Sequence, residues 1–166
     1  MMSAKLNKVI ILQGVFEPSV FDILKRRNVK EAFILEGRPG LEAARHSSRE
    51  LLKRKIRPML IADNMAGFLF YKNLVREVWV SYQYADRKGA LCQIGGLIMG
   101  VLGKKHNVPV NVYPNGRTMK LFGSSKDLSF FNSVKVTPRG VSAYVPLAEW
   151  VPSKYITKVY NGKSNG

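Results

Sequence analysis

This sequence is poor in cysteine and in long apolar runs, and both absences limit where the chain can work. One cysteine, Cys92, among 166 residues permits no internal disulfide, which favours a reducing, cytoplasmic compartment. No apolar run approaches the roughly 20 residues that a membrane-spanning helix needs. The first residues, MMSAKLNK, also lack the apolar stretch of a signal peptide. We therefore expect a cytoplasmic protein without a membrane partner.

Several motifs that carry well-known chemistry are missing as well. The chain has no Walker-type phosphate loop, no GxGxxG, no nucleophile elbow and no CxxC. Nucleoside triphosphate hydrolysis, dinucleotide binding and serine hydrolase chemistry therefore have no support. His46 and His106 fall on predicted helices, and neither has a second ligand at metal spacing. We accordingly predict no metal site and no other cofactor.

Acidic residues are scarce relative to basic ones. The chain has 11 Asp and Glu against 27 Lys and Arg, a net charge of +16. Such a field favours a polyanion, a phosphorylated ligand or an acidic protein surface. The basic residues gather at 25–30, 49–57 and 104–105. Solvated helix faces explain such clusters, but clusters on one side of the molecule would form a surface for RNA or the ribosome.

Short apolar runs alternate with helix-like segments along most of the chain. The runs predict strands at 9–12, 32–35, 59–62, 75–80 and 108–113, with helices at 19–27, 41–55, 64–73 and 94–106. This alternation is typical of βαβ units. We predict a single α/β domain over residues 1–166, with a Rossmann-like parallel sheet covered by helices on both faces.

Other segments depart from this rhythm. Residues 81–90 are predicted to be a polar connection, and residues 115–139 a long excursion without a clear period. A last strand is expected at 141–145 and a short C-terminal helix at 152–160.

Polar residues that follow the predicted strands are the candidates for a site, because open parallel sheets bind ligands beyond their carboxyl ends. Asp63 follows the third strand, either as an N-cap of the next helix or as a ligand or acid/base group. Arg38 lies in the turn 37–40 near a helix N-terminus, as an anion contact or a surface turn arginine. With Asp86, Arg87 and Arg117 these residues form a reasonable set for a sugar phosphate.

Cys92 is predicted to open a helix, where its pKa could be lowered. Because no histidine partner is evident, packing is the alternative that we favour.

Several short motifs also occur in one colinear order over residues 8–162. They are Glu36-Gly37-Arg38-Pro39, Ala44-Arg45, Glu50-Leu51, Ile61-Ala62-Asp63-Asn64-Met65-Ala66, Ala85-Asp86-Arg87, Ile94-Gly95 and Glu149-Trp150-Val151-Pro152. Together they resemble the family of methylthioribose-1-phosphate isomerases, ribose-1,5-bisphosphate isomerases and the alpha, beta and delta subunits of translation initiation factor 2B. The family fold is a helical N-terminal domain followed by a Rossmann-like domain, and this chain is similar only to the second.

The resemblance implies a chemistry and also marks departures from it. Family enzymes convert an aldose 1-phosphate to a ketose 1-phosphate with a cysteine after the first strand and an aspartate after the third. Asp63 matches the aspartate, whereas Val15 stands at the cysteine position, which removes a proton donor. Glu42 replaces a glutamine and adds a negative charge, and Cys92-Gln93 replaces Asn-Lys. We therefore expect a non-classical, regulatory member.

The resemblance also assigns a ligand and roles to individual residues. The ligand is a phosphorylated sugar or nucleotide, with Arg38, Arg45 and Arg87 as anion contacts and Asp63 holding a hydroxyl. Asn64, Asp86 and Gln93 complete the predicted ligand-binding set. The enzymatic alternative is an aldose-ketose isomerase in which Asp63 is the catalytic acid/base and Glu17 or Cys92 makes the second proton transfer.

Family members associate through this domain, so a homodimer is expected. Phe68, Phe70 and Tyr71 in the helix after Asp63 are the candidate interface.

Overall fold

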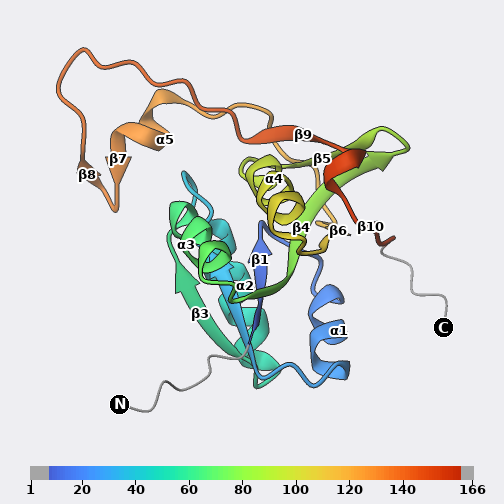
Figure 1. The fold of residues 1–166 in the computed structure, drawn as a ribbon. Helices are drawn as coiled ribbons and strands as arrows, with labels where there is room; N and C mark the ends of the chain where they lie inside the picture. Colours follow the sequence, from blue (N-terminus) through green and yellow to red (C-terminus); the bar gives the residue numbers. More distant parts are fainter. Residues whose placement is uncertain (1–7, 162–166) are drawn as a thin grey trace.

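The structure, a computed structural model, describes residues 8–161. A sheet of eight strands runs through them in the order β10, β6, β4, β1, β2, β3, and β5 pairs with both β4 and β9 (Figure 1). The strands are β1 (Val9–Gln13), β2 (Glu31–Leu35), β3 (Arg57–Ile61), β4 (Val75–Asp86), β5 (Gly89–Gln93), β6 (Val110–Pro114), β9 (Ala148–Pro152) and β10 (Lys158–Val159). The pairings β3–β2, β2–β1, β1–β4, β4–β6 and β6–β10 are all parallel.

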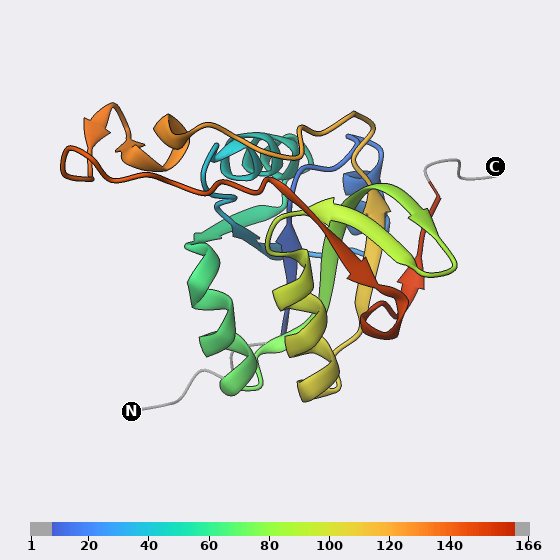
Figure 2. The same ribbon diagram turned by 90° about the horizontal axis from the view of Figure 1, so that it is seen from above.

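Helices cover both faces of this sheet (Figure 2). On one face lie α1 (Val20–Arg26) and α2 (Glu42–Lys53), and on the other α3 (Ala66–Tyr71) and α4 (Gly96–His106). Ile10 of β1 belongs to the apolar core beneath α1 and α2, whereas its neighbour Ile11 belongs to the core beneath α3 and α4. Successive strand residues point to opposite faces, so residues 9–12 of β1 must all be apolar, and a polar residue, Gln13, stands only at the end of the strand. The predicted α/β fold is confirmed.

The fourth strand is longer than its apolar run. We expected this strand to span residues 75–80 and a polar connection to follow it up to residue 90. This is wrong, because β4 continues to Asp86 and the chain then returns as β5. Ser81 and Tyr82 still pair with β6, and residues 82–86 then pair antiparallel with β5. Cys92 therefore lies on a strand and opens no helix.

Residues 115–147, which we call the arm, leave β6 and return at β9. They carry α5 (Ser125–Ser129) and a small hairpin of β7 (Phe130–Phe131) and β8 (Val134–Lys135). Figures 1 and 2 show the arm reaching past the sheet on the side where β1 ends. The predicted excursion is confirmed, but residues 141–145 form no strand.

The C-terminal helix predicted at 152–160 is wrong as well. This segment contains the end of β9, a 3-10 turn η2 (Ser153–Tyr155) and the edge strand β10. Thr157 and Tyr160 donate backbone hydrogen bonds to the carbonyls of Val110 and Val112 in β6. Hydrogen bonding to the open edge of β6 thus outweighs the helical tendency of the local sequence.

A buried polar cluster joins α1 to the sheet. The Glu77 carboxylate accepts two hydrogen bonds from Arg27, at 3.2 and 2.7 Å, and one each from Trp79 and Asn111. Burial opposes ionisation of this group, but the bonds from Arg27, Trp79 and Asn111 outweigh it and lower the pKa of Glu77. The cluster fixes α1 against β4 and β6.

Within residues 8–161 no helix has both the length and the apolar character needed to cross a bilayer.

Candidate functional site

The loop after β2 is held by Asp63. One carboxylate oxygen accepts the backbone N–H of Gly37 and the other that of Arg38, both at 2.8 Å. Asp63 begins a 3-10 turn whose N-cap is Ala62, so the prediction that it caps its own helix is wrong. Gly37 has a φ of +76°, and an added Cβ would lie 2.9 Å from Cβ of Ala43, so only glycine fits there. Asp63 thus fixes the backbone that carries Arg38.

Three buried polar side chains stand where the central strands end. Gln13 lies at the end of β1, Ser81 lies on β4 and Asn115 follows β6, and each is at most 7% exposed. Gln13 Oε1, Ser81 Oγ and Asn115 Nδ2 have no hydrogen-bond partner among the described residues. Buried polar atoms of this kind are rare and call for a partner.

The strand order places two of these side chains at a defined point. β1 and β4 are neighbours, but the chain leaves β1 toward β2 and β3 and continues from β4 toward β6. This reversal is the switch point at which doubly wound sheets bind ligands. An added Cβ on Gly14 would lie 2.0 Å from Ser81 Oγ and 3.4 Å from Gln93 Oε1, so Gln93 reaches to the same point.

A cavity of about 690 Å³, the strand-end pocket, opens between the β2–α2 loop and the arm. Gln93 and Ile94 line it from below, and Gln13 Nε2 donates a 2.8 Å hydrogen bond to the Ile94 carbonyl. The loop contributes Gly37 to Gly40 and Glu42, and the arm contributes residues 117–120, 122–124 and 127, with Leu147. The volume falls within the range of small-molecule sites.

Three cationic side chains line this pocket. The Arg38 guanidinium lies 4.7 Å from the centroid of the Phe131 ring, Arg117 pairs with Glu42, and Lys120 is exposed. The remaining carboxylate, Asp127, accepts the Ser124 N–H at 2.7 Å. Among residues 8–161, Arg38 and Lys120 have no carboxylate partner. Besides the Arg117–Glu42 pair, the lining thus holds two cations without an ion-pair partner and one carboxylate, which leaves a net positive charge for an anionic ligand.

Cys92 offers no acid/base group. The side chain is fully buried on β5, and burial with the nearby Glu149 carboxylate raises the pKa of its thiol to about 12. The expectation of a lowered pKa is therefore wrong, and the packing interpretation is confirmed. Val15, which was expected to replace the cysteine of the resembling enzymes, is buried as well.

The remaining predicted site residues lie apart from the pocket lining. Asp86 and Arg87 form the turn between β4 and β5, where Asp86 accepts the Lys88 N–H at 2.7 Å. Arg45 is exposed and donates a 2.6 Å hydrogen bond to the Gly40 carbonyl, which supports the β2–α2 loop from outside. Asn64 is exposed on the 3-10 turn. Of the predicted set, the structure brings together Arg38, Gln93 and, behind the loop, Asp63.

The predicted set left out other residues of this region. Gln13 and Asn115 were recognised as strand-end residues, because they directly follow apolar runs, but they were not assigned to the site. Ser81 was assigned to the predicted polar connection. Lys120 and Phe131 lie on the arm, whose sequence has no period, so nothing in it indicated that they meet the β2–α2 loop.

Comparisons with known proteins agree with this architecture. Residues 17–161 match the Initiation factor 2 subunit family. The chain is 31% identical over 144 residues to a methylthioribose-1-phosphate isomerase of Trichlorobacter lovleyi, covering 78% of this chain and 41% of that protein. It is 26% identical over 157 residues to the isomerase of the same name from Thermus thermophilus, covering 87% and 48%.

Solved structures show the same fold. The delta subunit of translation initiation factor eIF-2B from A. fulgidus superposes with a TM-score of 0.80 at 20% identity, covering 92% of this chain and 51% of that one. The 5-methylthioribose 1-phosphate isomerase from Pyrococcus horikoshii gives 0.78 at 21% identity, covering 93% and 50%. The chain spans about half the length of the relatives it matches. With most of its described residues matched by one family, the chain belongs to the Initiation factor 2 subunit family.

Proposed function

We propose that this chain binds a phosphorylated sugar or nucleotide in the strand-end pocket, as a non-classical, regulatory member of its family. The observation that carries the proposal is the pairing of uncompensated Arg38 and Lys120 at the pocket with unpartnered polar atoms beneath it. The curated relatives are named for an isomerase of a sugar phosphate, which supports the same class of ligand.

The proposed ligand is oriented by two kinds of group. Its phosphate pairs with Arg38 and Lys120, because charged donors form the strongest hydrogen bonds to phosphate oxygens. Its hydroxyl groups face the Gln93 carboxamide at the pocket floor, above the ends of β1 and β4. Asp63 acts behind the loop, by keeping Gly37 and Arg38 in place.

Binding without ordinary turnover is supported by the proton-transfer groups. Aldose-ketose isomerisation needs one group to remove a proton and another to return one. A valine stands at the position of the family cysteine, and the Cys92 thiol stays protonated at neutral pH. Both oxygens of Asp63 already accept backbone N–H groups.

Calorimetry or thermal shift at 150 mM salt tests this proposal with ribose 1-phosphate, ribose 1,5-bisphosphate, methylthioribose 1-phosphate and AMP. We expect one of these ligands to bind, and Arg38→Ala to weaken its binding by about tenfold or more, as for a lost charged hydrogen bond. Arg49→Ala removes an exposed charge from α2 outside the pocket lining and serves as the control. No binding by any of the four, or equal affinity in Arg38→Ala, would contradict the proposal.

The enzymatic alternative remains an isomerase that uses Asp63 with Glu17. Glu17 is half-buried close to Gly116, where an added Cβ would lie 2.5 Å from Glu17 Cγ. Turnover of methylthioribose 1-phosphate by this chain would favour it.

The proposal includes a homodimer. Its interface is the apolar surface of α3, the 3-10 turn before it and the neighbouring edge strand β3, with Leu60, Met65, Phe68 and Tyr71 exposed. Phe70, which was expected to belong to this surface, is 2% exposed and packs in the core.

A further inference from the structure

Basic residues are concentrated where the parallel strands begin, which we call the opposite edge of the sheet because it faces away from the strand-end pocket. In βαβ units each helix runs back toward the start of the strands, so all four helices that cover the sheet end there. Residues 25–27 end α1, 53–55 end α2, Lys72 follows α3, and Lys104 and Lys105 end α4. Cations at helix C-termini complement the helix dipole, which explains why they occur at these positions. It does not explain how their charge is balanced.

The two halves of this edge differ in their ion pairs. At the ends of α1 and α2, carboxylates pair with part of the basic side chains. Arg27 lies 2.7 Å from Glu77, and Arg54 lies 2.7 Å from both Asp22 and Glu50. The charge of this half is therefore partly balanced within the chain.

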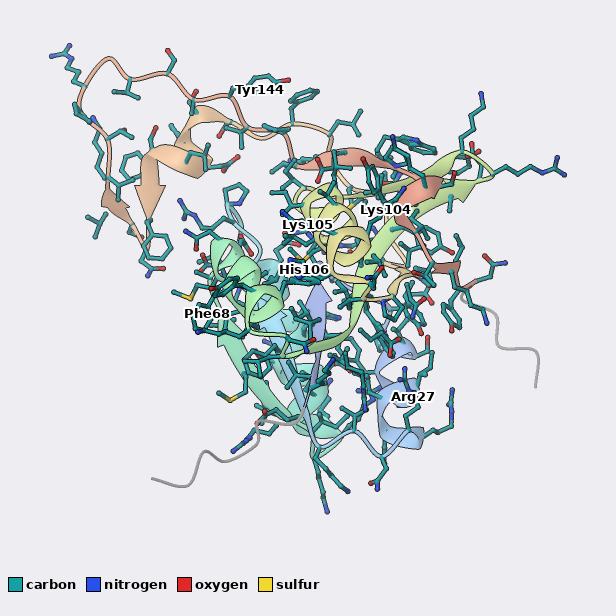
Figure 3. The ribbon with its side chains drawn as sticks, viewed as in Figure 1. Arg27, Phe68, Lys104, Lys105, His106 and Tyr144 are labelled. Atoms are coloured by element: carbon teal, nitrogen blue, oxygen red, sulfur yellow. The ribbon has the colours of Figure 1, made fainter. Side chains whose placement is uncertain are left out.

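The half formed by α3, α4 and the C-terminal segment has no such compensation. Residues 66–76, 96–110 and 153–161 contain no Asp or Glu. Within the part of the chain that the structure describes, Lys72, Lys104, Lys105 and Lys154 form no ion pair. Figure 3 shows Lys104, Lys105 and His106 together at the end of α4. This half therefore carries positive charge with no carboxylate of its own to balance it.

A notch of about 400 Å³ lies in this basic half, between the end of α4 and the η2–β10 segment. Lys104, Asn107, Lys154, Tyr155 and Thr157 line it. The Nζ atoms of Lys104 and Lys154 lie 5.5 and 5.1 Å from the centroid of the Tyr155 ring. Two ammonium groups thus flank one aromatic ring inside a hollow that is large enough for a nucleotide.

Aromatic rings accompany lysines beyond the notch as well. Lys72 Nζ lies 5.4 Å from the ring centroid of Tyr71, which is 77% exposed. Lys158 Nζ lies 4.6 Å from the ring centroid of Tyr160, although that ring already stacks on Tyr113. Proteins that bind single-stranded nucleic acid without sequence preference combine two features. Cationic side chains contact the phosphate backbone, and aromatic rings stack on the bases. An acidic peptide or an anionic membrane would use the charges but not the notch.

We propose that the notch and the surrounding lysines bind a single-stranded nucleic acid, with phosphates on Lys104 and Lys154 and a base on Tyr155. Such a ligand would account for part of the net charge of +16, most of which lies outside the strand-end pocket. The site lies at the opposite edge of the sheet and does not depend on the sugar-phosphate proposal.

Fluorescence anisotropy of the whole chain with labelled 12-nucleotide RNA and DNA, from 50 to 200 mM KCl, tests this proposal. We expect the logarithm of the binding constant to fall linearly with the logarithm of salt concentration, by about 0.7 per phosphate contacted. The double variant Lys104→Ala, Lys154→Ala should bind about tenfold more weakly and lose about 1.4 from this slope. Tighter binding of RNA than of DNA would identify RNA as the ligand.

The matched control is Lys25→Ala, Lys30→Ala, which removes two exposed charges from the α1 half. It should change affinity less than about threefold, since it lies outside the notch. Tyr155→Leu should weaken binding at least about fivefold with an unchanged salt slope, because stacking carries no counterion release.

Three results would overturn the proposal. They are no binding of either oligonucleotide at 50 mM KCl, an equal loss in the control variant, and competition by polyglutamate or phosphatidylserine vesicles as strong as by the oligonucleotide. Circular dichroism checks that each variant is folded, and the exposed lysine variants keep the test decisive if Tyr155→Leu is unstable.

Discussion

Asp63 acts on the pocket through the backbone of another loop. Its two oxygens satisfy the N–H groups of Gly37 and Arg38, which orients the Arg38 side chain toward Phe131 and the pocket. A single carboxylate thus connects the end of β3 to the end of β2. Its position after an apolar run could be predicted from the sequence, whereas its two partners required the parallel pairing of β2 with β3.

Asp63→Asn tests whether this carboxylate positions the loop or carries protons. An amide has one acceptor oxygen, so its NH₂ group would face one of the two backbone donors. We expect ligand affinity to fall about tenfold, by one lost charged hydrogen bond, while any turnover at saturating substrate persists. Asp86→Asn, at the β4–β5 turn, should change neither quantity. Lost turnover with unchanged affinity would instead support the isomerase, and calorimetry with a steady-state assay separates the two.

The predicted helices and strands agree with the structure where periodic apolar runs determine it. They differ from the structure where pairing between distant strands determines it. Residues 9–12 of β1 and 32–35 of β2 are apolar because helices cover both faces of the sheet, and both strands were predicted. The predicted fourth strand ended before Ser81 because the apolar run ends there, whereas β4 continues through this polar residue to Asp86. β9 and β10 form because they pair with the free edges of β5 and β6. The local sequence of these segments does not indicate such pairing.

The arm was recognised only as an irregular segment. Its contacts with the body, Phe131 on Arg38 and Arg117 on Glu42, join residues about 75 to 93 positions apart. Local propensity cannot report contacts at such separation, so the roof of the pocket could not be predicted. The same two contacts occupy both arginines of the pocket, and a phosphate must compete with Phe131 and Glu42 for them.

The edge strand β3 and the helix α3 give the homodimer proposal its test. Leu60 is 56% exposed and Phe68 is 61% exposed, more apolar surface than solvent alone favours. Light scattering should give twice the 18.7 kDa of the chain, and Phe68→Lys should give the mass of one chain. Leu52→Lys, which alters an exposed leucine of α2, is the control. A wild-type mass of 18.7 kDa would contradict the dimer.

At the scale of the whole molecule, few carboxylates must stabilise a strongly basic chain. Hydrogen bonds from Arg54 to Asp22, from Lys53 and Arg54 to Glu50, and from Arg27 to Glu77 lower the pKa values of these three carboxylates. A carboxylate with a lower pKa in the folded chain stabilises the fold above its unfolded pKa. This stability is lost as the pH falls through the folded pKa.

Glu77→Gln tests the most buried of these pairs. We expect a loss of about 2 kcal/mol at pH 7, less than a fully buried pair would cost, because the Arg27 side chain is 40% exposed. The variant should also lose less stability than the wild type between about pH 4.3 and lower values, where Glu77 takes up its proton. Urea unfolding at pH 7, 4 and 3 measures both effects. Glu36→Gln should reproduce neither, and equal pH dependence in wild type and Glu77→Gln would contradict the assignment.

Helix α4 extends from one proposed site to the other. Ile94, just before it, lines the strand-end pocket, and Lys104, in its last turn, lines the notch. Its 11 residues make a rod of about 16 Å at 1.5 Å per residue. A sugar phosphate cannot reach both ends, so the two ligands do not compete for space. An effect of one ligand on the affinity for the other would therefore be transmitted through the protein or through long-range charge, and a spectroscopic probe on α4 would show whether this helix is displaced.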